Sequence, residues 1–183
     1  MQEIEEIKLP ASGLAEDILA QFVTNAQKEL DNSATENKRQ DGETSYHLVT
    51  FHLAREEYGV EISGVQEIIR ATDITPVPGA PRHVKGVINL RGKIIPVVDL
   101  RTRFNLPAIA ENDAQRIVVV ELGEKRLGML VDSVSQVIRL PAGVVEDIPE
   151  EATTIDDNCI KGIGKLDSRL IIMLDLNQSL LSA

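Results

Sequence analysis

Residues 86–100, GVINLRGKIIPVVDL, indicate two short apolar strands joined by a tight turn at Asn89–Gly92. A second stretch, KGIGKLDSRLIIMLDL at residues 161–176, aligns with residues 85–100 when the chain is shifted by 76 positions. Six of the sixteen aligned residues are identical. At the turn, however, Arg91 is aligned with Asp167. The turn is therefore predicted to form with either charge, so folding alone does not explain why residue 91 is an arginine.

The repeat extends upstream. Residues 58–70, YGVEISGVQEIIR, align with residues 127–139, LGMLVDSVSQVIR, at a shift of 69. From residue 46 onward, short apolar runs alternate with turn residues, which favours small barrels or a sandwich with few helices, near 101–104 and 177–181. We therefore predict one domain, 46–183, made of two related β units at about 46–105 and 115–183. Units of this size have marginal cores, so the two should pack together and leave a groove along their seam.

The first 45 residues form a separate, acidic extension. Apolar residues between 14 and 30 recur at helical spacing, which predicts an amphipathic helix. Residues 31–45, DNSATENKRQDGETS, are polar and show no periodicity, which is typical of a flexible linker.

Composition excludes several classes of function. The net charge of −10 argues against nucleic-acid binding and against attachment to membrane surfaces through basic residues. Aromatic residues make up 3% of the chain, too few for a base-stacking platform. Cys159 is the single cysteine, which fits a reducing compartment. No apolar run reaches the roughly 18 residues of a membrane span. We expect a cytoplasmic protein with no direct membrane insertion.

Residues that could support catalysis do not form a recognisable set. His47, His52 and His83 have no metal-ligand spacing with one another or with Cys159. Asp99 and Asp175 resemble a catalytic pair, but each precedes a short helical turn, where an aspartate caps free N–H groups. We therefore predict no enzyme activity, no cofactor and no metal.

Three stretches resemble one family closely. EEYGVEISGVQEII at 56–69, VKGVINLRGKIIPVVDLRTRF at 84–104 and RLGMLVDSVSQVI at 126–138 are similar to the CheW family of bacterial chemotaxis coupling proteins. The resemblance runs from residue 46 to about 180. It implies a mainly β fold of two packed, SH3-like, five-stranded barrels. It also implies a scaffold without catalysis, which joins the cytoplasmic tip of methyl-accepting chemoreceptors to the regulatory domain of the histidine kinase CheA.

The resemblance also implies site residues. It places the receptor-binding groove at Val65, Glu67 and Arg91, along the seam between the barrels. It marks further positions that shape the groove or meet a partner: Gly86, Asn89, Gly128 and Val134. Kinase contacts are expected at the outer ends of the barrels. From the charge difference between the repeats we predict that the Arg91 guanidinium reaches Glu67.

Two alternatives stay open. One is a CheW-like adaptor of surface motility or of another receptor-coupled pathway. The other is a small-molecule-binding protein or enzyme that uses the groove between the barrels, which predicts several titratable groups converging there.

Overall fold

The computed structural model describes residues 7–8, 44–71, 73–152 and 157–181. The predicted helix at 14–30 and the linker to residue 43 lie outside the described residues. The mainly β fold with short helices is confirmed. The strands are β1 (Ile7–Lys8), β2 (Ser45–Leu53), β3 (Glu56–Glu61), β4 (Val65–Arg70), β5 (Val84–Leu90), β6 (Lys93–Asp99), β7 (Arg116–Leu122), β8 (Lys125–Val131), β9 (Ser133–Pro141), β10 (Val145–Glu146), β11 (Ile160–Leu166) and β12 (Arg169–Leu174).

Short helices connect these strands. Within the described residues there are two α-helices, α2 (Leu100–Arg103) and α3 (Leu176–Leu181), and both fall where the sequence predicts them. Four 3₁₀ turns complete the described elements: η2 (Ile62–Gly64), η3 (Ala142–Val144), η4 (Glu150–Ala152) and η5 (Asp157–Cys159).

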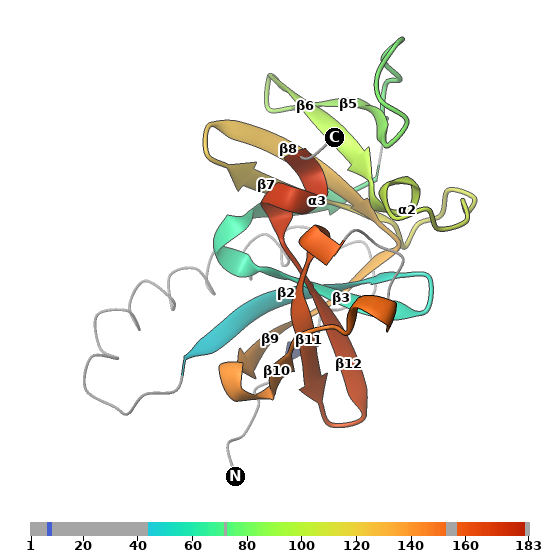
Figure 1. Cartoon of the computed structure of the whole chain (residues 1–183). Coiled ribbons are helices and arrows are strands. Elements are labelled where there is room, and N and C mark those ends of the chain that lie inside the picture. The colour runs from blue at the N-terminus through green and yellow to red at the C-terminus, as the bar shows by residue number, and fades with distance from the viewer. Residues whose placement is uncertain (1–6, 9–43, 72, 153–156, 182–183) are drawn as a thin grey trace.

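The strands form two sheets. The seven-stranded sheet has the order β1-β9-β2-β3-β12-β11-β10, and the five-stranded sheet has the order β4-β7-β8-β6-β5. Figure 1 shows the five-stranded sheet above the seven-stranded one, with α2 and α3 between their main bodies. Neither set of pairings closes into a hydrogen-bonded barrel within the described residues. The short β1, which pairs with β9 at Val137 and Gln136, was not expected from the sequence.

Each sheet takes strands from both repeats. The β2–β3 hairpin comes from the first repeat, but it pairs with β9 and with β12 of the second. The β7–β8 hairpin comes from the second repeat and pairs with β4 and β6 of the first. The chain changes sheet at η2 and again between β8 and β9. The boundary between the sheets therefore does not follow the predicted division into 46–105 and 115–183, because the repeats exchange their first hairpins.

Individual hydrogen bonds occur at matching positions in the two repeats. The Asp99 N–H donates to the His83 carbonyl at 2.8 Å, and the Asp175 N–H donates to the Cys159 carbonyl at 2.9 Å. The Asp99 carboxylate accepts from the Arg101 N–H, and the Asp175 carboxylate accepts from the Gln178 N–H, both at 3.0 Å. The expected matching positions of the two aspartates, as helix caps, are confirmed.

Three hydrophobic clusters follow this arrangement. One lies within each sheet: Leu48, Ile138, Leu140, Leu166, Ile171 and Met173 in the larger, and Ile88, Ile95, Val97, Ile117, Val119 and Leu130 in the smaller. The largest cluster takes residues from both sheets, including the stacked rings of Phe51, Tyr58 and Phe104. Burial there raises the pKa of Tyr58 to about 12. The repeats thus share a core, as their small size predicts.

Candidate functional site

The β5–β6 turn presents Arg91 to solvent. Arg91 has φ 52° and Gly92 has φ 81°, both in the left-handed region that tight hairpin turns require. The Asn89 side chain accepts a hydrogen bond from the Gly92 N–H at 3.0 Å, so its contact in this structure is within the turn. Asp167 has the same φ of 52° in the β11–β12 turn. The backbone therefore forms with either charge, and the Arg91 side chain is 81% exposed.

Arg91 reaches Glu67, as predicted. Its Nη2 lies 3.0 Å from Glu67 Oε2, and the Glu67 side chain is only 13% exposed. Glu67 lies on β4 and Arg91 follows β5, and these strands are the two edges of the five-stranded sheet. The ion pair therefore connects the edges of one sheet. The expectation that it crosses the seam between the two units is wrong, because β4 and β5 both belong to the first repeat and to one sheet.

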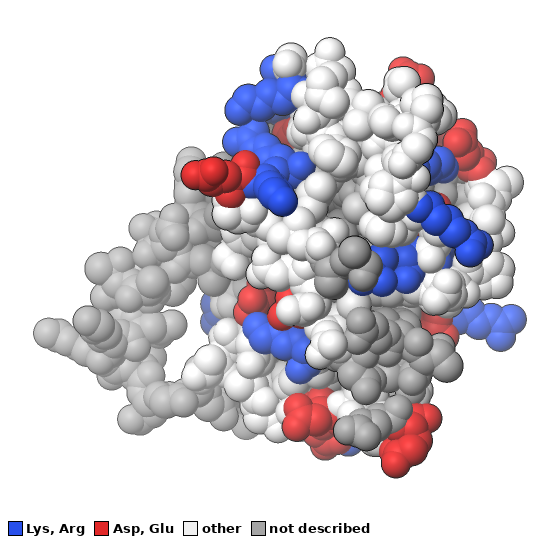
Figure 2. All heavy atoms as spheres, turned by 45° about the horizontal axis from the view of Figure 1, so that its top comes forward, with Lys and Arg blue, Asp and Glu red and all other residues white. Residues whose placement is uncertain are grey.

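This ion pair lies at a hollow of about 330 Å³. We call it the basic hollow, and its lining residues are Gln66, Glu67, Leu90, Arg91, Lys93, Val119 and Arg126. Three cations and one carboxylate line it, although the whole chain carries a net charge of −10. One of the cations, Arg126, also pairs with Glu121 outside the lining, with Nε 3.5 Å from Oε2. Figure 2 shows Lys and Arg side chains grouped at its upper left, over the β5–β6 and β7–β8 turns. The hollow thus favours an anionic group on a binding partner.

The other sheet carries different charges at the matching positions. The repeat aligns Arg126 with Glu57 and Lys93 with Arg169. Glu57 and Arg169 form an ion pair, with Nε 3.3 Å from Oε2, and the Glu57 side chain is 9% exposed. In the basic hollow two cations occupy these positions, so they cannot pair with each other. We call the Glu57–Arg169 site closed, because its charges pair with each other, and the basic hollow open, because its matching cations do not.

Apart from Asn89 in the turn, the other predicted site residues pack into the interior. Val65 is fully buried in the shared core, and Val134 packs against the same core from β9. A Cβ at Gly86 would lie 2.2 Å from the Thr75 carbonyl oxygen, and one at Gly128 would lie 2.6 Å from Ile117 Cγ2. Of the seven predicted residues, the basic hollow brings together Glu67 and Arg91. The contacts of the other five serve packing or the turn.

Most of this chain is similar in sequence to known proteins. A family model described as "CheW-like domain" matches residues 47–183. The chain belongs to this family. "Chemotaxis protein CheW" of Klebsiella aerogenes is 36% identical over 77% of this chain and 86% of that protein. "Chemotaxis protein CheW" of Treponema pallidum is 34% identical over 73% and 81%. The crystal structure of the scaffolding protein TtCheW from Thermoanaerobacter tengcongensis matches with a TM-score of 0.69 and 37% identity, over 77% and 91% of the two chains.

Sequence reasoning missed two of the three cations that line the basic hollow in this CheW-like domain, Lys93 and Arg126. Arg126 could have been predicted, because its repeat counterpart Glu57 has the opposite charge. It lies one residue before the stretch that was aligned. Lys93 gave no such signal, because its counterpart Arg169 is also a cation.

The described part of the CheW-like domain lacks two other kinds of feature. Within the described residues, no three or more His, Cys, Asp or Glu side chains gather closely enough to hold a metal ion. Among the same residues, no helix has the length and apolar character needed to cross a membrane.

Proposed function

We propose that this protein is a non-catalytic chemotaxis adaptor. It joins the cytoplasmic tips of methyl-accepting receptors to the histidine kinase CheA, and it works in the cytoplasm, attached to receptor arrays through these partners. The observation that carries the proposal is the basic hollow, a cationic recess on an acidic chain, held by the Arg91–Glu67 ion pair. The names of its relatives, chemotaxis proteins and a scaffolding protein, support the same role.

The receptor would bind as a helical hairpin at the basic hollow, with acidic side chains toward the cations. The Arg91 guanidinium can hold Glu67 with one part of its planar fork and donate to a receptor carboxylate with another. Leu90 and Val119 give the hollow an apolar wall for the helix. No bond forms or breaks in this mechanism, and the signal passes as a change in the relative position of the partners.

The kinase would bind elsewhere, through two exposed aliphatic side chains. Ile94 is 65% exposed and Leu170 is 57% exposed, and they occupy matching positions of the repeat, one in each sheet. An isolated exposed aliphatic residue is ordinary, but a matched pair on two hairpins suits a partner that itself has two related barrels. Heterologous contacts at both ends would let the adaptor and the kinase extend into an array.

The test compares two adjacent cations on β8. Arg126→Glu places a carboxylate in the basic hollow, whereas Lys125→Glu makes the same charge change one residue outside its lining. Binding is measured with a receptor cytoplasmic fragment and with CheA, each from the same organism. We expect Arg126→Glu to weaken receptor binding roughly tenfold, equivalent to about 1.4 kcal/mol, and to change CheA binding little. Equal receptor affinities of the two variants would contradict the proposal.

The pathway is decided by a second measurement. Capture of the full-length chain from native lysate, followed by identification of the receptor that is recovered with CheA, distinguishes flagellar chemotaxis from surface motility. Recovery of a small molecule in the basic hollow, with no receptor or kinase, would instead favour the small-molecule alternative.

A further inference from the structure

The junction of α2 with the β8–β9 crossover is closed by an internal arginine. Arg101 Nε donates to Asp132 Oδ1 at 2.7 Å, and its Nη2 donates to Oδ2 at 2.6 Å. Its Nη1 also donates to the Pro107 carbonyl. The side chains of Arg101 and Asp132 are 11% and 16% exposed. Asp132 accepts a further bond from the Ala54 N–H at 2.8 Å, so the carboxylate that holds this guanidinium is itself fixed.

The repeat has a second junction of the same kind, where η2 meets the start of α3. The shifts of 69 and 76 align Asp132 with Ser63 and Arg101 with Asn177. Both replacements are shorter and uncharged. They line a hollow of about 280 Å³, which we call the polar hollow. The matched hydrogen bonds of Asp99 and Asp175 show that α2 and α3 begin alike, whereas Ser63 lies in the 3₁₀ turn η2 and its counterpart Asp132 lies in the bend between β8 and β9.

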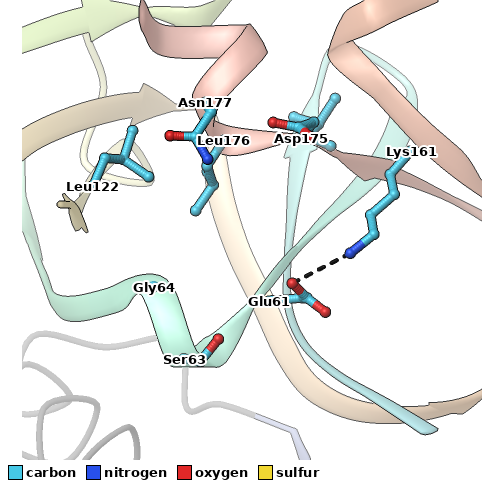
Figure 3. A pocket seen from close by; sticks show the side chains of 9 residues that line it. Glu61, Ser63, Gly64, Leu122, Lys161, Asp175, Leu176 and Asn177 are labelled. Atoms are coloured by element: carbon cyan, nitrogen blue, oxygen red, sulfur yellow. Dashed lines mark ion pairs between the residues drawn. The ribbon is translucent and has the colours of Figure 1, made fainter. Parts of the chain in front are cut away.

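The polar hollow is lined by acidic groups but has no cation at the position that Arg101 occupies in the other junction. Asp175 occupies the position of Asp99, whose charge adds to the hydrogen bond that Arg101 donates to Asp132 in raising the pKa of Arg101. Glu61 replaces the buried Leu130, which brings a new carboxylate to the hollow. Leucine side chains, including those of Leu122 and Leu176, provide an apolar wall (Figure 3).

Lys161 stands at the edge of this polar hollow. Its Nζ lies 3.4 Å from Glu61 Oε2 and 5.2 Å from the centre of the Tyr46 ring. Figure 3 shows the Lys161 side chain extending toward Glu61, apart from Asn177 and Leu122. Lys161 therefore neutralises one of the two carboxylates, and the lining keeps a net negative charge.

We propose that the polar hollow binds an arginine side chain of a partner protein, in the place that Arg101 fills at the other junction. Asn177 Oδ1, Ser63 Oγ and the Glu61 carboxylate supply acceptors for the planar guanidinium fork. The leucine wall packs against the aliphatic stem of the arginine. The volume suits one long side chain and is below that of most drug-sized ligand sites.

The probe for this site is N-acetyl-arginine methylamide, titrated into the full-length, isotope-labelled protein. The readout is the NMR shift of the Gly64 backbone amide and of the Asn177 side-chain amide. N-acetyl-glutamate methylamide serves as the anionic probe. We expect saturable shifts with the arginine probe and none with the glutamate probe. Binding of the glutamate probe alone would overturn the proposal, because the hollow would then be an anion site built on Lys161.

Matched variants identify the carboxylate involved. Glu61→Gln and Glu146→Gln each remove a glutamate paired with a β11 lysine, Lys161 and Lys165 respectively. Only Glu61 lines the polar hollow. We expect Glu61→Gln to weaken binding of the arginine probe roughly threefold and Glu146→Gln to leave it unchanged. Equal effects of the two variants would contradict the proposal.

Three further variants test whether the partner's arginine takes the place that Arg101 fills at the α2 junction. Lys161→Met removes the competing cation and should tighten binding of the arginine probe. The double variant Ser63→Asp/Asn177→Arg rebuilds the closed junction and should abolish binding, because its own guanidinium occupies the hollow. Asn177→Leu is the simpler substitution if the double variant does not fold, and it should also remove the site. Unchanged probe binding in a folded Asn177→Leu protein would place the site elsewhere.

Discussion

The two hairpins β5–β6 and β11–β12 share a fold and differ in charge. Both turns hold a non-glycine residue at φ 52°, and both hairpins are followed by an aspartate that caps a short helix. Beneath the β11–β12 turn, Glu57 and Arg169 pair, whereas beneath the β5–β6 turn Lys93 and Arg126 do not. At the helices the relation is reversed, since the α2 junction is closed by an ion pair and the α3 junction contains a hollow. Each of these hairpins, together with the helix that follows it, thus combines one closed site with one open site.

This comparison separates what the duplicated fold requires from what each copy adds. Matching glycines and aspartates maintain turns, close packing and caps in both copies. Changes of charge leave the backbone in place and decide whether a site stabilises the protein or is free to bind a partner. The comparison predicts large stability effects at closed sites and small ones at their open counterparts.

The largest effect is expected at the α2 junction. Arg101→Leu removes a bidentate partner and leaves the half-buried Asp132 carboxylate without its ion pair. We expect a loss of about 3 kcal/mol in the free energy of unfolding. For a protein of this size that corresponds to a decrease of roughly 10 °C in Tm. The matched substitution Asn177→Leu, at the open junction, should change Tm little. Equal decreases in Tm of the two variants, measured by calorimetry, would show that the two junctions contribute equally to stability.

The next effect concerns glycines that both repeats use. A Cβ at Gly86 would collide with the Thr75 carbonyl oxygen at 2.2 Å, and one at the counterpart Gly162 would lie 2.8 Å from Val145 Cγ1. We expect Gly86→Ala to cost about 2 kcal/mol and Gly162→Ala somewhat less, because a side chain yields more readily than backbone. Chemical denaturation measures both. If Gly86→Ala weakened receptor binding without loss of stability, Gly86 would belong to the binding surface.

A smaller effect should depend on pH. Burial by itself would raise the pKa of Asp132, but the hydrogen bonds from Arg101 and from the Ala54 N–H, with the charge of Arg101, outweigh it and lower the pKa. A carboxylate with a lowered pKa stabilises the fold above the ordinary value of about 4, and that stability is lost as the pH falls through the folded-state pKa. We therefore expect Asp132→Asn to cost about 1.5 kcal/mol at pH 7 and progressively less below pH 4.

Urea unfolding at a series of pH values checks this expectation. The counterpart Ser63→Ala, which removes no titrating group, should show the same pH dependence as the wild-type protein. A difference between wild type and Asp132→Asn that stays constant down to the acid limit would show that the carboxylate does not act through its charge.

The sequence was informative where the repeats agree and less so where they exchange partners. The turn, the capping aspartates and the short helices follow from local patterns, which is why they could be predicted. The Arg91–Glu67 contact was also predicted, from a charge difference. The exchange of the β2–β3 and β7–β8 hairpins could not be predicted, because the strands of both hairpins pair in the same register, so the repeat pattern does not say which hairpin joins which sheet. That exchange joins the two repeats through a common core, in which Val65 is buried and against which Val134 packs.

The smallest effect on stability, and the most informative for binding, is expected at Arg91. Its side chain is 81% exposed, and the turn adopts the same conformation with Asp167 in the other repeat, so the fold has no need of the cation. We expect Arg91→Ala to change the free energy of unfolding by less than about 0.5 kcal/mol, because exposed ion pairs contribute little. Receptor affinity should nevertheless fall roughly tenfold, since the variant loses the fork that orients Glu67 and donates to the partner. Arg91→Lys keeps the charge and should recover only part of the affinity. Thermal unfolding and titration with the receptor fragment, performed on the same samples, distinguish the two roles. A large loss of stability with unchanged receptor affinity would make Arg91 a residue of the fold.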